Sequence, residues 1–173
     1  IGLVFQESGR AFDPLQNIGS VFYETLKNEN PHISKDEAKN KTISLLREVG
    51  LPDPEGRLKA YPHQFSGGQL QRIGIALALA QNCRLLIADE PTTALDVTIQ
   101  AKILELIKEI QNETGLSVIY ITHDLGVVAK VADYEAVMYA GRIVEKGRIN
   151  EIFYDPRHPY TWGLLDSMPD VDT

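Results

Sequence analysis

The sequence predicts an α/β fold: a parallel, doubly wound sheet with an all-helical subdomain inserted between two of its strands. From residue 84 onward, short apolar runs alternate with longer amphipathic stretches, and a strand–helix–strand–helix order favours parallel strands. Residues 15–81, in contrast, carry only helical patterns, although they follow an apolar run at the start of the chain. We therefore expect the helical residues to interrupt the sheet.

The composition limits the classes of protein that fit. The chain has 173 residues, of which 43% are hydrophobic and 24% charged, which suits a globular domain with a small appendage. A net charge of −7 argues against a nucleic-acid partner. A single cysteine, Cys83, excludes an internal disulfide and an all-cysteine metal site. The opening Ile-Gly-Leu-Val-Phe lacks a basic flank, so we expect a strand of something longer and not a signal peptide.

The first half of the chain predicts one strand and three helices. Residues 1–14 are expected to form a core strand and a loop. Ser34 and Glu37 have the spacing of a capping box, which predicts a helix start. The helices are expected over 17–28, 35–49 and 67–81, with a proline-rich connector at 51–62.

The second half predicts the rest of the sheet. Strands are expected over 85–88 and 117–122, each followed by a helix, at 97–113 and 125–132. Gly141 divides two short β-rich runs, 136–140 and 142–145, which predicts a hairpin. A proline-punctuated tail follows.

Ser66-Gly67-Gly68-Gln69 opens one of the predicted helices. The first N–H groups of a helix are unpaired and its dipole end is positive, so this turn is a candidate phosphate site that two glycines let a ligand approach. The alternative is a plain Ser N-cap with glycines in a turn.

Asp89 and Glu90 follow four apolar residues at the end of a predicted strand. A carboxylate there suits a phosphate-bound Mg²⁺, which we assign to Asp89. Glu90 is then placed to polarise an attacking water. The alternative is a strand that simply ends in acidic residues.

Three further polar residues stand at predicted element ends. Gln6 follows the first strand and could bind Mg²⁺ or orient water. His123 follows the strand at 117–122 and could donate to a γ-phosphate, although a lone histidine is more often an ordinary surface residue. Asp96 is expected to cap the helix at 97–113, whatever else it does.

Nowhere in the chain does Lys follow Gly, so the phosphate-cradling loop G-x-x-x-x-G-K-[ST] is not among these residues. We therefore expect the chain to be the second part of an ATPase. We also predict that these 173 residues alone bind ATP weakly and hydrolyse it negligibly.

Taken together, the motifs resemble those of the nucleotide-binding subunit of ATP-binding-cassette (ABC) transporters. The likeness runs from residue 1 to about 147. The matching motifs are Val4-Phe5-Gln6 (Q-loop), Phe65-Ser66-Gly67-Gly68-Gln69 (the LSGGQ signature, with Phe for Leu), Leu85-Leu86-Ile87-Ala88-Asp89-Glu90 (Walker B and catalytic glutamate), Ala94-Leu95-Asp96 (D-loop) and His123 (switch histidine).

The resemblance implies a P-loop NTPase-like core that binds ATP and Mg²⁺ and works as a head-to-tail dimer at the cytoplasmic face of the cell membrane. Residues 1–14 would form a core strand and Q-loop, 15–81 the helical subdomain, 82–147 the RecA-like core and 148–173 a C-terminal tail. Implied partners are a second ABC ATPase subunit, transmembrane permease subunits and, indirectly, an extracellular solute-binding protein.

The resemblance also implies a role for each site residue. Ser66, Gly67, Gly68 and Gln69 would face a nucleotide held mainly by the partner. Four other residues would face the nucleotide of their own protomer. Glu90, His123 and Gln6 would take part in catalysis, and Asp89 and Gln6 would bind the metal. Asp96 is counted among the nucleotide-binding residues.

The tail indicates a branch of the family. Tyr154-Asp155-Pro156-Arg157-His158-Pro159-Tyr160-Thr161 resembles the C-terminal segment of oligopeptide, dipeptide and nickel importer ATPases. We expect an ATPase that powers import of oligopeptides or dipeptides, with a nickel importer or a non-transport ABC ATPase as alternatives. The Q-loop at 7–14 is more basic and glycine-rich than is usual in this branch.

Overall fold

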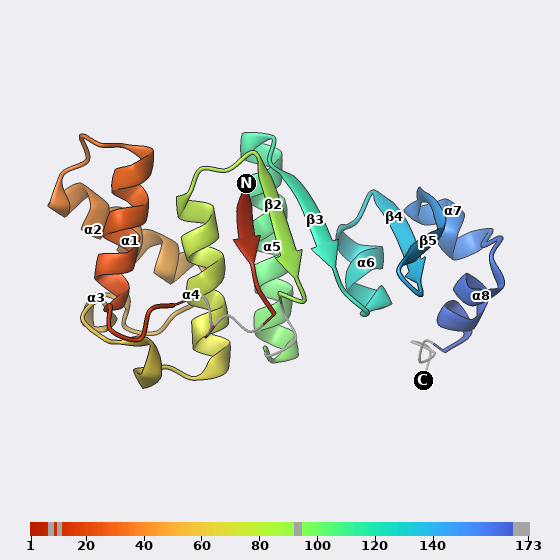
Figure 1. Cartoon of the computed structure of the whole chain (residues 1–173), viewed down its shortest axis with the longest axis horizontal. Coiled ribbons are helices and arrows are strands. Elements are labelled where there is room, and N and C mark those ends of the chain that lie inside the picture. Colours follow the sequence, from red (N-terminus) through yellow and green to blue (C-terminus); the bar gives the residue numbers. More distant parts are fainter. Residues whose placement is uncertain (7–8, 10–11, 92–94, 168–173) are drawn as a thin grey trace. The chain divides into compact units, whose positions relative to one another are not determined.

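The computed structural model describes residues 1–6, 9, 12–91 and 95–167 (Figure 1). The chain forms two compact units, residues 1–121 and 122–173, which are described separately. The boundary between them falls inside the range 82–147, which we expected to form one core region.

The first unit is built on a three-stranded parallel sheet in the order β1-β2-β3. The strands are β1 (Gly2–Val4), β2 (Leu85–Asp89) and β3 (Ser117–Ile121). The predicted parallel α/β fold is therefore confirmed. Because parallel strands run the same way, the three carboxyl ends meet at one edge of the sheet, which is where the sequence places its polar motifs.

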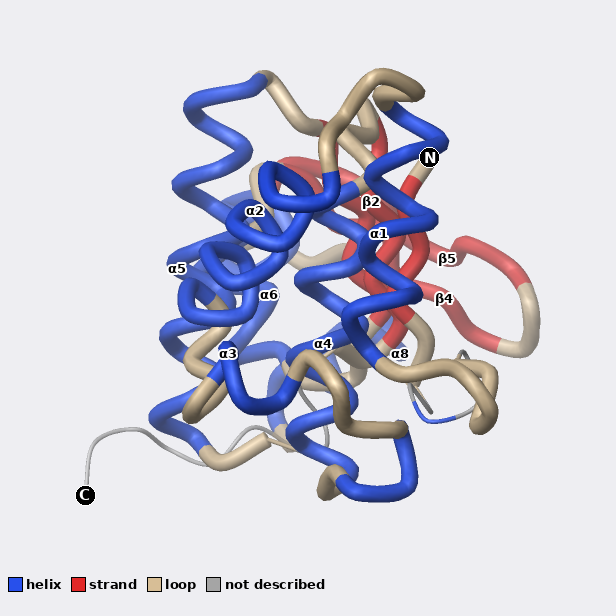
Figure 2. Tube along the Cα trace, turned by 90° about the vertical axis from the view of Figure 1, so that its left-hand side faces the viewer, coloured by secondary structure: helices blue, strands red, loops and turns tan. Residues whose placement is uncertain are grey.

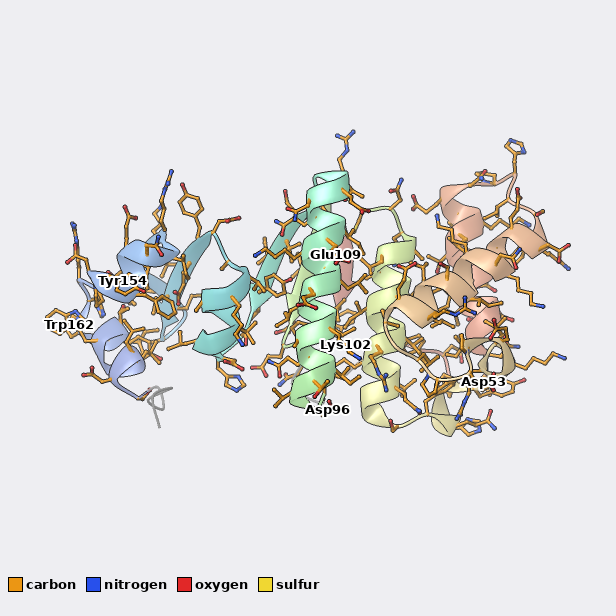
Figure 3. All side chains as sticks on the ribbon, turned by 180° about the vertical axis from the view of Figure 1, so that it is seen from behind. Asp53, Asp96, Lys102, Glu109, Tyr154 and Trp162 are labelled. Carbon is orange, nitrogen blue, oxygen red and sulfur yellow. The ribbon has the colours of Figure 1, made fainter. Side chains whose placement is uncertain are left out.

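Two helices, α4 (Gly67–Ala80) and α5 (Val97–Thr114), pack with one face of this sheet. Figure 3 shows α5 lying over the strands and running roughly along them, with Lys102 and Glu109 on α5 labelled. The core between helices and sheet is formed by fully buried aliphatic side chains: Ile73, Ile75, Leu86, Ile103 and Ile107. Burial of this face holds the strand ends and the helix starts in one rigid body.

The helical residues form a small bundle in which α1 (Ile18–Glu29), α2 (Lys35–Glu48) and α4 contact one another (Figure 2). Ser34 and Glu37 make the predicted capping box at the start of α2. The bundle core is again apolar, with Ile18, Phe22, Leu26 and Leu46 fully buried.

Two short helical segments, α3 (Pro54–Arg57) and η2 (Pro62–Gln64), lie within or overlap the residues expected to form a connector. Asp53 caps α3 through its carboxylate, which accepts from the N–H of Gly56 at 3.3 Å. A proline stands at the start of each turn, where its fixed φ suits a helix and its missing N–H costs nothing. The prolines were therefore helix-start signals as well as connector signals.

In its described residues, 122–167, the second unit contains a β-hairpin and three helices. Its elements are α6 (Leu125–Val131), β4 (Tyr134–Tyr139), β5 (Arg142–Arg148), α7 (Ile149–Tyr154) and α8 (Pro159–Asp166). The predicted hairpin is confirmed. Its two-residue turn, Ala140-Gly141, has positive φ at both positions, as a type I′ turn requires.

None of the helices in the described part of the chain combines the length and the apolar character needed to cross a membrane.

Glu145 of β5 holds the start of α8. Its carboxylate accepts hydrogen bonds from the N–H groups of Arg157 (2.7 Å) and His158 (3.0 Å) and from the hydroxyl of Thr161 (2.5 Å). Burial by itself raises the pKa of Glu145, but these donors, with Thr161 the strongest, outweigh it and the pKa lies below its usual value. Burial, and then the charge of Glu145, raise the pKa of Glu135 across the hairpin.

We predict that Glu145→Ala loosens the tail, because three donors lose their acceptor. Trp162, the single tryptophan, lies in α8 and reports this as a shift of its fluorescence. Since the folded-state pKa is lowered, the stabilisation is present above the ordinary value of 4.5 and is lost as the pH falls through the folded-state pKa.

The wavelength of maximum Trp162 emission in the wild type is therefore expected to stay constant from neutral pH down to about pH 5 and to shift at lower pH. This shift should come before any change in the far-ultraviolet circular dichroism. The Glu145→Ala variant lacks this acid step. Lys146→Ala, the exposed neighbour on β5, is the control and should match the wild type. Equal emission from the Glu145→Ala protein and the wild type would contradict the role of this carboxylate.

Candidate functional site

The acidic pair, Asp89 and Glu90, lies at the carboxyl end of the central strand. Asp89 is the last residue of β2 and pairs with Ile121 of β3. Glu90 follows it with φ of +46°, a left-handed conformation that is unfavourable for a residue with a side chain. Its N–H donates to the carbonyl of Ile121 at 2.8 Å, which holds it beside β3.

Gln6 lies at the same edge. It follows β1 by two residues and is exposed, and β1 ends at Val4, which pairs with Ala88 of β2. An amide oxygen and the carboxylate of Asp89 are the hard oxygen ligands that Mg²⁺ prefers. Within the described residues no cluster of three metal-binding side chains occurs.

The glycine turn, Ser66–Gln69, forms the start of α4. Ser66 is the N-cap, and its Oγ accepts from the N–H of Gln69 at 3.3 Å. The Oε1 of Gln69 accepts in return from the N–H of Ser66 at 3.0 Å, which completes a capping box. The plain capping role that the sequence allowed for Ser66 is therefore present, and it orients both side chains at the start of a 14-residue helix.

Gly67 has no packing reason to be glycine. A Cβ added there meets no atom within 4 Å among the described residues, and Gly67 is exposed. Glycine within a helix costs roughly 1 kcal/mol relative to alanine. The open space above the turn therefore leaves room for a ligand to approach the main chain, as an anion site requires.

Asp96 and His123 belong to other elements of the chain. Asp96 is the N-cap of α5, with Oδ1 accepting from the N–H of Ile99 at 3.0 Å, as predicted. The residues just before it, 92–94, lie outside the described part of the chain, as do 7–8 and 10–11 of the predicted Q-loop. His123 is exposed and belongs to the second unit, next to Asp124, which caps α6.

One residue near the acidic pair was missed by the sequence reasoning. Gln71, in the second turn of α4, is only 1% exposed, and its Nε2 donates to the carbonyl oxygen of Glu90 at 3.0 Å. Its position offered a signal, because it shares a helix face with the buried Ile75 and Ala78. A polar residue on an apolar stripe needs a buried partner.

Comparison with known proteins identifies the family of the chain. Residues 1–93 match the family model described as ABC transporter, and residues 144–173 match the one described as the C-terminal region of oligopeptide/dipeptide transporters. Among solved structures, a dimeric post-hydrolysis state of the ATP-binding cassette MJ0796 bound to ADP and phosphate is 30% identical, with a TM-score of 0.77 over 86% of this chain and 62% of that one.

Two curated relatives match along the whole chain. The oligopeptide transport ATP-binding protein OppD of Bacillus subtilis is 59% identical over 100% of this chain and 48% of its own length. The dipeptide transport ATP-binding protein DppD of Lactococcus lactis is 53% identical over 100% of this chain and 50% of its own length. This chain thus spans about half the length of the curated relatives it matches. It belongs to the ABC transporter family and carries the C-terminal region of the oligopeptide/dipeptide branch.

Proposed function

We propose that the protein containing this chain binds and hydrolyses ATP and thereby powers the import of oligopeptides or dipeptides. The observation that carries the ATPase part is the acidic pair at the carboxyl end of the central strand, tied by Gln71 to the helix that begins with the glycine turn. The names of the relatives and the match of the tail support peptides as cargo in preference to nickel.

Each residue has a distinct role in this proposal. Glu90 polarises the water that attacks the γ-phosphate, which is the usual task of a carboxylate beside a triphosphate. The metal that neutralises the phosphates is held by Asp89 and Gln6. His123 contacts the γ-phosphate and senses its loss, and Asp96 lies beside the nucleotide at the boundary between two cassettes.

The glycine turn serves the second cassette. Ser66, Gly67, Gly68 and Gln69 present main-chain N–H groups and a hydroxyl to a nucleotide held mainly by the partner subunit. A γ-phosphate bound by both surfaces favours the closed dimer, and hydrolysis removes that preference. The solved dimer of a related cassette, bound to ADP and phosphate, supports the pairing of two cassettes.

The rest of the proposal concerns the cell. The helical subdomain, residues 15–81, transmits closure and opening to transmembrane permease subunits at the cytoplasmic face of the membrane. A solute-binding protein outside the cell delivers the peptide. The other regions have the roles expected from the sequence. Residues 1–14 form the core strand and Q-loop, residues 82–147 the RecA-like core, and residues 148–173 the peptide-importer tail.

The test is ATP hydrolysis by the intact protein with its permease in lipid vesicles. We expect hydrolysis that needs Mg²⁺, stops when EDTA removes it, and rises when a peptide-loaded solute-binding protein is added. Peptide accumulation in the vesicles should depend on ATP supplied on the side of the membrane that carries the ATPase. Hydrolysis that responds to nickel and to no peptide would refute the cargo, and no Mg²⁺-dependent hydrolysis would refute the ATPase.

A further inference from the structure

The main chain of Glu90 is held from two sides. The carbonyl oxygen of Glu90 accepts from the side-chain amide of Gln71 in α4 at 3.0 Å, and the N–H of Glu90 donates to Ile121 of β3 at 2.8 Å. Gln71 is almost fully buried, so its hydrogen bond is shielded from competition with water. The residue is thereby fixed between a helix and a strand that are far apart in sequence.

This clamp coincides with an unfavourable backbone conformation. The φ of Glu90 is +46°, whereas residues with a side chain prefer negative φ. Such a conformation persists only where its surroundings hold it, and it is found most often at functional sites. Because the direction of the Cα–Cβ bond follows from the backbone angles, the same contacts that hold the main chain also aim the carboxylate.

We propose that Gln71 is a positioning residue: its amide holds Glu90 in the left-handed conformation that directs the carboxylate toward the attacking water. The proposal rests on the proposed role of Glu90 in hydrolysis. In this proposal Gln71 acts on the reaction through Glu90.

The position of Gln71 gives the contact a second consequence. Gln71 lies five residues after Ser66 on the same continuous helix, and Ser66 opens the glycine turn. The helix that begins with the glycine turn therefore also carries the residue that holds the carbonyl of Glu90.

A purely structural role is the competing explanation, because a buried glutamine could simply satisfy a buried carbonyl. The two explanations differ in what the loss of the amide does. A structural role lowers stability and affects every function alike. A positioning role lowers kcat, leaves ATP binding intact, and has no effect when the carboxylate of Glu90 is absent.

The test uses Gln71→Met in the intact protein, since methionine keeps the size of the side chain and removes the donor. We expect kcat for ATP hydrolysis to fall by about 10- to 100-fold, the cost of a misplaced catalytic group. The KM for MgATP should change by less than about threefold, because binding groups are untouched. Gln71→Leu, which also removes the donor and buries no charge, should show the same loss and serves if the methionine variant does not fold.

A double-mutant cycle separates the explanations. In a Glu90→Gln background, Gln71→Met should change the residual rate by less than about twofold, because both changes act through one group. The matched control is Gln81→Met at the other end of α4, which should keep the wild-type kcat. Thermal unfolding midpoints of all variants are measured alongside.

Wild-type kcat in the Gln71→Met protein, or an equal fractional loss in both backgrounds, would overturn the positioning role. Absence of ATP hydrolysis in the wild type would instead defeat the proposed function. The two failures are thus distinguishable in one set of measurements.

Discussion

Glu90→Gln is expected to reduce ATP turnover to a small residual rate while leaving ATP binding intact. Glutamine matches glutamate in size and its amide cannot take up a proton, so the attacking water loses its general base. Loss of a general base lowers kcat by about 10²- to 10⁴-fold. The backbone contacts of Glu90 with Ile121 and Gln71 involve only main-chain atoms of Glu90 and are kept in the variant.

The second part of this expectation concerns the dimer. Without hydrolysis the γ-phosphate remains, so the variant should accumulate as an ATP-bound dimer that the wild type forms only transiently. Size-exclusion chromatography with ATP and Mg²⁺ measures this, together with steady-state hydrolysis. Glu113→Gln, an exposed carboxylate near the end of α5, is the control and should behave as the wild type. Unchanged kcat in Glu90→Gln would remove Glu90 from catalysis.

Ser66→Arg should prevent the ATP-dependent dimer from closing. Ser66 and Gly67 are exposed, and the space beside Gly67 is open, so an arginine at position 66 projects into the space proposed for the γ-phosphate of the partner's nucleotide. Its bulk excludes the triphosphate from the helix N-terminus. We expect no ATP-induced dimer and a loss of hydrolysis as large as that of Glu90→Gln.

The substitution also removes a helix cap, which is worth about 0.5–2 kcal/mol, so the control must share that loss. Ser66→Ala removes the cap and the hydroxyl without adding bulk or charge, and it should lower the stability of α4 and weaken ATP-dependent dimerisation without preventing it. Ser44→Arg places the same side chain on the exposed surface of α2 and tests for a general effect of charge. Undiminished dimerisation of Ser66→Arg in analytical ultracentrifugation would contradict the proposed interface.

Local patterns explain why much of the site could be predicted. Asp89 was expected at a strand end because four apolar residues precede it, and β2 does end there. The caps at Ser34, Ser66 and Asp96 follow from side chains that bond to main-chain atoms three residues away. Contacts of such short range leave a readable pattern in the sequence.

The conformation of Glu90 could not be predicted in this way. Positions with a left-handed φ are usually occupied by Gly, Asn or Asp, so a glutamate at such a position gives no sign of its conformation in the sequence. The conformation depends on a carbonyl of β3 and an amide of α4, which come from distant parts of the chain. Glu145 likewise accepts hydrogen bonds from donors at the start of α8 that are 12 to 16 residues away. This separation matches no period of a helix or a strand, so the sequence pattern does not reveal the contact.

The sequence by itself determined the parallel sheet, the inserted helices, the hairpin and the placement of polar groups at element ends, because hydrophobic period and capping chemistry act over a few residues. Only the tertiary structure decided that Gln71 meets Glu90 and that the tail is held by Glu145. Each of these contacts joins side chains and main-chain groups from different elements. Its existence therefore depends on how those elements pack together and not on any repeat along the chain.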